Sequence, residues 1–577
     1  MATRTTTQSG NWNSTSTWGG NPVPGIGDRV QIGHHVVVTA DTTVGEKLSD
    51  ATNAIYFTGG PGSLTVNDGV LLSVRGFLYG NDAGALTLGA GSILEFDVPV
   101  GWRYSLKHYS ATFTINGTQA APAIVRSKPG GGVADILCWT GFEAPIDANW
   151  CDFTDLGSAT VEAIYSGYPS ATGIFSLRHC RFIRCGQLYQ YREVGTAINR
   201  VEDCTWTGTL HATKSAQVAT TTARSTGTYS FARNILDKRL YSTGMRDYTI
   251  EDCFFDDVPE LLSGGGSNYN GSLMRRCLVR KPAHSDTNWP IATTQDVYWV
   301  EDHTTANPHF LSPNSPRNYL IEGMLFEYSG TDSQGDCITQ APSSGFELII
   351  QYCLVVPNAD GAGRAGPISS HGGFPGTTVR IRHNTFFSAA EPGVALGEAT
   401  GGLDYAGQIP QYQSNLCVAC VGASGAFAVS DVGLAVTNVM TPSGATHNCH
   451  GPGIAAGSSG KGYNYATTGT APGANDLPLG TDPQFVDRTR RLSKWDLSLG
   501  GPGTTAGAMA RLRADPLLLA SSAIPYVRQG FSPTNPLLLN AGHDGVTIGA
   551  VAYTAAGGIG PVGGRSKSPL VGSPLVR

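Results

Sequence analysis

The amino-acid sequence predicts an all-β fold, a right-handed parallel β-helix, from one recurring phrase, its spacing and its central residue. The phrase is an apolar residue, two polar residues, a small central residue, one free position and a second apolar residue. Successive copies lie between 19 residues (Asn234 to Cys253) and 31 residues (Cys353 to Asn384) apart, which is a solenoid period. The central residues are Cys151, Cys180, Cys204, Asn234, Cys253, Cys277, His303, Met324, Cys353, Asn384 and Asn415.

Each copy describes a short strand with one buried face. Alternation across the central residue and the apolar residue two places later is typical of a strand, and the two polar residues before it indicate a bend. A strand that returns about every 25 residues pairs in parallel with its own copy one coil later, about 4.8 Å away. Coiled parallel connections are overwhelmingly right-handed. The central residues should therefore stack as a ladder inside the coil.

The composition narrows the range of partners. The chain has 577 residues, with 75 Gly, 33 Pro, 14% charged residues and a net charge of −6. Because no basic run occurs, nucleic acid is not an expected partner. No apolar stretch approaches the roughly 20 residues of a membrane span, so membrane insertion is not expected. No spacing of His or Cys predicts a metal site, and no cofactor is predicted.

Cysteine usage indicates a reducing compartment. Six of the 12 Cys occupy the ladder position, so we interpret them as reduced core residues rather than a disulfide framework. The first residues, MATRTTTQSGNW, are polar and predict no secretory signal. An extracellular-looking architecture without an export signal suggests release by lysis, a combination that favours a virion component made in the host cytoplasm over a secreted enzyme.

We divide the chain into four parts. They are a glycine-rich N-terminal cap with the first coils (1–100), the β-helix with loop excursions (101–420), an irregular C-terminal β region with a short helix (421–552) and an exposed tail (553–577). The helix is expected within Ala506–Ser522, which has the clearest helical period of the chain.

Two segments carry a resemblance to known proteins. Trp12, Trp18 and the run V-P-G-I-G-D-R-V-Q-I (23–32) resemble the glycine-rich N-terminal caps of phage-encoded and bacterial β-helix proteins. Similar caps occur in the eight-glycine domain of fibrocystin-like and hyaluronan-degrading proteins. The phrase D-P-Q-F-V-D (482–487) resembles the closing phrase of β-helix repeat proteins and implies a last strand pair.

Candidate catalytic residues lie in the loop around residues 330–340 and downstream of it. Asp332 and Asp336, followed by His371, loosely resemble the polygalacturonase family, whose acidic residues and His-Gly element line a β-helix groove. Inverting hydrolysis needs two carboxyls about 6.5–9.5 Å apart. The sequence departs from that family because the paired Asp-Asp is absent and Arg382 replaces an expected Lys. The alternative is a turn rich in Gly and Asp.

Aromatic side chains in polar loops are candidates for sugar binding. Trp289 and Tyr269 offer apolar faces that suit sugar rings, or they bury themselves against a neighbouring subunit. In contrast, His303 falls on the ladder position, and Glu301 and Asp302 repeat the bend residues of two earlier coils, so this segment is interpreted as structural.

The sequence is thus interpreted as a bacteriophage virion structural protein, a tail spike or fibre or a capsid-surface decoration, that adheres to the host surface or its glycan. The tail-spike resemblance implies a homotrimer. Expected partners are other virion proteins and host surface polysaccharide. The alternative is a polysaccharide depolymerase, a hydrolase or lyase, that uses the groove residues. A bacterial surface adhesin is disfavoured by the missing signal.

Overall fold

The structure is a computed structural model, and it describes most of the coil and the C-terminal helices. The described residues are 2–46, 53–58, 62–80, 84–99, 106–108, 112–131, 136–138, 146–166, 174–192, 199–211, 214–220, 229–242, 248–256, 273–281, 318–328, 335–340, 347–357, 365–370, 378–387, 395–396, 411–418, 428–429, 445–452, 464–465, 475–478 and 480–550.

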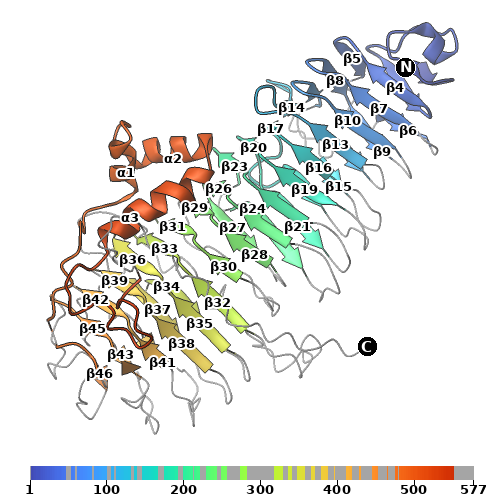
Figure 1. Ribbon diagram of the computed structural model, residues 1–577. Coiled ribbons are helices and arrows are strands. Elements are labelled where there is room, and N and C mark those ends of the chain that lie inside the picture. The colour runs from blue at the N-terminus through green and yellow to red at the C-terminus, as the bar shows by residue number, and fades with distance from the viewer. Residues whose placement is uncertain are drawn as a thin grey trace.

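The described strands form parallel sheets that run along a solenoid, which confirms the predicted fold class (Figure 1). Three long sheets, here named A, B and C, contain 10, 16 and 15 of these strands. Most coils place one strand in each sheet, and each strand pairs in parallel with its counterpart in the next coil. From β34 onward, two short sheets take the place of sheet A in the chain order.

Sheet A consists of β1 (Ala2–Thr5), β3 (Asp28–Ile32), β6 (Asn53–Phe57), β9 (Phe77–Gly80), β12 (Leu106–His108), β15 (Ile136–Cys138), β18 (Ile164–Ser166), β21 (Leu188–Arg192), β24 (Lys214–Thr220) and β27 (Arg239–Ser242). The short sheets consist of β34 (Gly335–Gln340), β37 (Ala365–Ser370) and β40 (Ala395–Leu396), and of β43 (Ala428–Val429) and β46 (Asn464–Tyr465).

Sheet B consists of β2 (Gly10–Asn11), β4 (His35–Val38), β7 (Ser63–Val66), β10 (Ala85–Leu88), β13 (Thr112–Asn116), β16 (Ile146–Asn149), β19 (Phe175–Arg178), β22 (Asn199–Glu202), β25 (Tyr229–Ala232), β28 (Tyr248–Glu251), β30 (Leu273–Arg275), β32 (Asn318–Glu322), β35 (Glu347–Gln351), β38 (Thr378–Arg382), β41 (Gln411–Gln413) and β44 (Ala445–Thr446).

Sheet C consists of β5 (Thr42–Gly45), β8 (Leu71–Arg75), β11 (Ile93–Phe96), β14 (Ala123–Ser127), β17 (Cys151–Thr154), β20 (Arg181–Ile183), β23 (Thr205–Thr207), β26 (Ile235–Leu236), β29 (Phe254–Phe255), β31 (Leu278–Lys281), β33 (Leu325–Tyr328), β36 (Leu354–Pro357), β39 (Thr385–Phe387), β42 (Leu416–Val418) and β45 (Cys449–His450).

The predicted ladder is present at the corner between sheets B and C, with one exception. All of its described members, from Cys151 to Asn415, are fully buried. The exception is His303, which itself lies outside the described residues. Strand β31 pairs directly with β33, and Leu325 N–H donates to Cys277 O (2.8 Å). The rungs of Cys277 and Met324 are therefore neighbours, and the prediction of a separate rung at His303 between them is wrong.

The residue before each ladder residue makes the bend by adopting a left-handed backbone conformation. We call these residues the turn column; their φ values lie between 52° and 65°. This region is costly for most side chains, yet the backbone bonds continue through it: Asp203 N–H donates to Ala232 O (3.0 Å). The described turn column is Trp150, His179, Asp203, Arg233, Asp252, Arg276, Gly323, Tyr352, His383, Ser414 and His447.

Two tryptophans fill the core at its N-terminal edge. Trp12 and Trp18 are fully buried, with their ring centroids 5.2 Å apart in an edge-to-face arrangement. Both indole N–H groups are satisfied, because Trp12 donates to Pro24 O (3.2 Å) and Trp18 donates to Trp12 O (2.7 Å). Both rings therefore belong to the continuous hydrophobic core of the coil.

The C-terminal segment (residues 480–550) folds back over the outer face of sheet C (Figure 1). It contains helices α1 (Leu492–Ser498), α2 (Thr505–Ala514) and α3 (Ile524–Gly530) and a π-helical turn (Leu519–Ala523). Helix α2 and this turn lie in the stretch expected to be helical. Helix α1 lies where the closing phrase implied strands, so that expectation is wrong for Leu492–Ser498.

Sheet C is apolar on both faces beneath this segment. Leu236 and Phe255 point into the coil, whereas their neighbours Ile235 and Phe254 pack outward against the helices. The outer cluster includes Trp495 and Leu512 of the C-terminal segment. The solenoid and the C-terminal segment therefore share one hydrophobic layer.

The ladder continues beyond residue 420, through Asn448 to Asp476, whose carboxylate accepts from Asn448 N (2.8 Å). None of the described helices is long and apolar enough to cross a membrane. The predicted tail, 553–577, lies outside the described residues.

Candidate functional site

The structure leaves the sequence-predicted site residues largely undescribed. Asp332, His371, Trp289 and Tyr269 lie outside the described residues. Of Asp336 only the backbone is described, in β34. Their proposed roles in catalysis and glycan binding stay predictions.

The backbone register nevertheless constrains the grouping of these residues. Asp336 lies opposite Gly366, whereas Ser370, which immediately precedes His371, lies opposite Gln340. Because four residues of strand span roughly 13 Å, Asp336 and Ser370 lie about that far apart along the strand direction. A shared site would have to bridge that separation.

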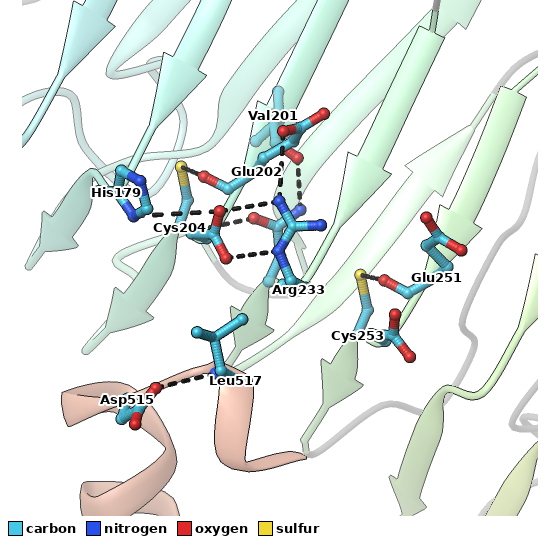
Figure 2. Close-up of polar contacts among 12 residues, drawn as sticks. His179, Val201, Glu202, Cys204, Arg233, Glu251, Cys253, Asp515 and Leu517 are labelled. Atoms are coloured by element: carbon cyan, nitrogen blue, oxygen red, sulfur yellow. Dashed lines mark hydrogen bonds and ion pairs between the residues drawn. The ribbon is translucent and has the colours of Figure 1, made fainter. Parts of the chain in front are cut away.

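Charged residues of the turn column bind one another from coil to coil (Figure 2). Arg233 donates to both carboxylate oxygens of Asp203 (2.6 and 2.9 Å) and to Glu202 (3.3 Å). The hydrogen bonds to Asp203 raise the pKa of the Arg233 guanidinium. Arg276 repeats this arrangement on Asp252, with two bonds of 2.7 Å. These bidentate pairs fix the stacking of neighbouring coils.

The bend predicted to be structural at Glu202–Asp203 and Glu251–Asp252 is therefore confirmed as structural. Glu251 is bonded by Arg275 (2.7 Å) and Arg276 (3.0 Å). Burial alone would raise the pKa of Glu251, but the two guanidiniums lower it. Carboxylates held in this way are engaged in ion pairs and are poorly suited to proton transfer.

Inside the bend, the Cys and Asn side chains of successive rungs donate to equivalent backbone carbonyls. Each donates to the carbonyl three residues before the preceding ladder residue: Cys204 Sγ to Leu177 O (3.5 Å), and Asn234 Nδ2 to Val201 O (2.8 Å). Asn234 Oδ1 also accepts from Cys204 N (2.9 Å), a bond that a thiol at this position does not reproduce. Figure 2 shows Cys204 and Cys253 near Arg233, with their Sγ atoms in contact with Glu202 O and Glu251 O.

The ladder thiols are buried structural groups. The eight cysteines whose side chains are described are free and buried. Burial raises the pKa of Cys353 to about 12, so its reactive thiolate form is suppressed. The prediction of unpaired core cysteines is confirmed for these residues, and they do not form a nucleophilic site.

A cluster of ionisable and polar side chains lies where the C-terminal segment meets the turn column. His383 is fully buried, and its two ring nitrogens face oxygens of that segment. Nε2 lies 3.0 Å from Asp544 Oδ2, and Nδ1 lies 3.3 Å from Thr547 O. Burial is the main reason that the pKa of His383 is lowered, although Asp544 opposes it. A buried imidazole is therefore held against a half-exposed carboxylate.

A second histidine of the C-terminal segment completes the group. His543 Nδ1 lies 2.9 Å from Ser414 Oγ, which also accepts from His543 N (2.8 Å). Its ring centroid is 5.2 Å from that of His383. Burial lowers the pKa of His543 to about 4. At neutral pH this imidazole is uncharged and has a lone pair available.

This cluster does not have the arrangement of a hydrolase triad. Asp544 faces His383, whereas Ser414 contacts His543, so no single histidine joins the hydroxyl to the carboxylate. Ser414 is also fully buried. In contrast, His383, His543 and Asp544 each present one potential ligand atom within 4.8 Å of the others, an arrangement that could hold a metal ion.

Sequence reasoning missed this cluster because its members are about 160 residues apart. One signal was available: the doubled apolar residues after several ladder positions, such as Phe254–Phe255 and Leu278–Val279, indicate that sheet C is covered outside as well as inside. The fold defines the class of this protein as a parallel β-solenoid. No family model, no curated protein and no solved structure matches the chain, so the class rests on the fold alone.

Proposed function

We propose that this chain is a structural protein of a bacteriophage particle, a tail spike or fibre or a capsid-surface decoration, which presents a rigid rod to the host surface. The observation that carries the proposal is the set of ion pairs between neighbouring coils along the turn column. Arg233 and Arg276 bind carboxylates of the preceding coil, so their charge stiffens the rod. The resemblance of residues 12–32 to phage-encoded caps supplies the phage context.

The proposal also covers the partners of the chain and its location on the virion. The rod associates as a trimer, binds other virion proteins and contacts host surface polysaccharide. Sedimentation of the purified chain tests the first part, because a trimer has three chain masses at micromolar concentration. A single chain mass would contradict the trimer and leave the rod as a monomeric decoration.

Incubation with surface polysaccharides from bacterial hosts tests the role. Binding without a change in polysaccharide chain length supports adhesion. Shortening that disappears in Asp332→Asn and Asp336→Asn would replace this proposal with the depolymerase alternative. If the polysaccharide is neither bound nor shortened, the role of the chain is restricted to building the particle.

A further inference from the structure

The contacts of His383 place a ring nitrogen beside a carboxylate oxygen of the C-terminal segment. The carbonyl of Thr547 can only accept, so a hydrogen bond between it and His383 uses a proton on Nδ1. With that tautomer, the lone pair of His383 Nε2 points toward Asp544 Oδ2 at 3.0 Å. A nitrogen lone pair and a carboxylate oxygen that converge in this way can coordinate one cation.

The distances fit two ligands of one ion. Nitrogen and oxygen ligands lie about 2.0–2.2 Å from zinc, so two ligands at angles between 90° and tetrahedral are about 2.8–3.6 Å apart. The separation between His383 Nε2 and Asp544 Oδ2 is 3.0 Å. The group as a whole spans up to 4.8 Å, so one ligand must move inward by about 1 Å to close the site. His543 lies on an irregular segment, which can make this adjustment.

The surroundings support the ligand set. Ser414 Oγ can accept the Nδ1–H of His543, which leaves Nε2 for a metal; such outer contacts commonly orient metal-binding histidines. His447 follows Ser414 in the turn column, and its buried Nδ1 has no hydrogen-bond partner among the described residues. Arg382 adds positive charge nearby, but its Nε is bonded to Gln351 (2.8 Å).

We propose that His383, His543 and Asp544 bind a divalent transition-metal ion, with zinc as the best fit, and that this ion fastens the C-terminal segment to the coil. Two imidazoles and one carboxylate are a ligand set that suits zinc. One ligand comes from the coil and two come from the segment, so the bound ion links chain regions about 160 residues apart. This inference does not depend on the proposed function.

Zinc binding to the full chain tests the inference. After chelation and dialysis, the wild-type protein should take up one zinc ion per chain, measured by elemental analysis after gel filtration. Asp544→Asn and His543→Gln should each weaken zinc binding at least tenfold. His179→Gln is the matched control, because His179 lies in the same turn column seven rungs before His383. It should bind zinc as the wild type does.

Ser414→Ala should weaken zinc binding by about 10- to 100-fold, the usual effect of losing an outer contact. Limited proteolysis provides the second readout: zinc should slow cleavage within residues 531–550 in the wild type and in His179→Gln, but not in Asp544→Asn. Circular dichroism confirms that each variant is folded. No stoichiometric zinc, or equal zinc binding in all variants, would overturn the site. Zinc binding without protection would overturn the fastening role.

Discussion

Replacing Asn415 by Ala should destabilise the coil, because this side chain serves two rungs. It is fully buried, and its Oδ1 accepts from both Asn384 N and Asn384 Nδ2 at 3.0 Å. Its Nδ2 donates to Ile381 O (2.9 Å). Asn384 Nδ2 keeps a second acceptor in Ile350 O (3.1 Å), but the side-chain bond to the Asn384 backbone N–H is lost.

The magnitude follows from these contacts. A buried donor without a partner costs about 1–3 kcal/mol, and each lost hydrogen bond costs about 1 kcal/mol more. Asn415→Ala should therefore lower the free energy of unfolding by about 3–5 kcal/mol. Asn415→Cys should cost only about 1–3 kcal/mol, because a thiol donates to the same carbonyl at other rungs, as Cys204 does.

Urea unfolding of the full chain measures the total effect, and hydrogen exchange of peptides covering 378–387 locates it. Asn67→Ala is the control, since Asn67 is exposed in a turn and its loss should change stability by less than about 0.5 kcal/mol. If Asn415→Ala costs no more than Asn67→Ala, or if exchange in 378–387 is unchanged, the ladder does not hold the rungs together as argued.

Three further predictions concern charge and burial. The pKa of Glu251 is lowered in the folded chain. Its ionised carboxylate therefore stabilises the fold above the ordinary glutamate pKa of about 4.3, and this contribution is lost as the pH falls through the lowered pKa. In Glu251→Gln the free energy of unfolding should therefore fall less steeply in acid than in the wild type. Burial raises the pKa of Glu327, whose Oε1 accepts a hydrogen bond from Leu492 N (3.1 Å). Glu327→Gln keeps an acceptor oxygen without the buried charge, so its free energy of unfolding at pH 7 should match or exceed that of the wild type. Glu327→Leu loses the acceptor, so its free energy of unfolding should fall by about 1–3 kcal/mol. Burial raises the pKa of Cys185 to about 12, so a thiol reagent should label Cys185 and Cys353 only after denaturation.

Each of these has a clear contrary result. An acid unfolding profile of Glu251→Gln that parallels the wild type would show that the guanidiniums do not stabilise the carboxylate. Equal stability of Glu327→Gln and Glu327→Leu would show that the bond to Leu492 does not anchor helix α1. Rapid labelling of Cys353 in the folded chain, identified by peptide mass, would show that the interior is open.

The ladder was predictable because it depends on local rules repeated along the chain. A strand period of two and a regular return distance place Cys151 and its later copies on one line before any contact is known. The same rule failed at His303, whose phrase matches the pattern. Only the pairing of β31 with β33 shows that Cys277 and Met324 are neighbours, and spacing alone does not distinguish a rung from an excursion of similar length.

By itself the sequence determined the parallel coil, its reduced interior and the structural use of Glu202–Asp203, because each follows from periodicity and composition. The tertiary structure alone decided where the C-terminal segment lies, and therefore that His383 meets His543 and Asp544. The physical reason is that the segment carries no repeat. Its position is set by the apolar outer face of sheet C, a surface that exists only once the coil has formed.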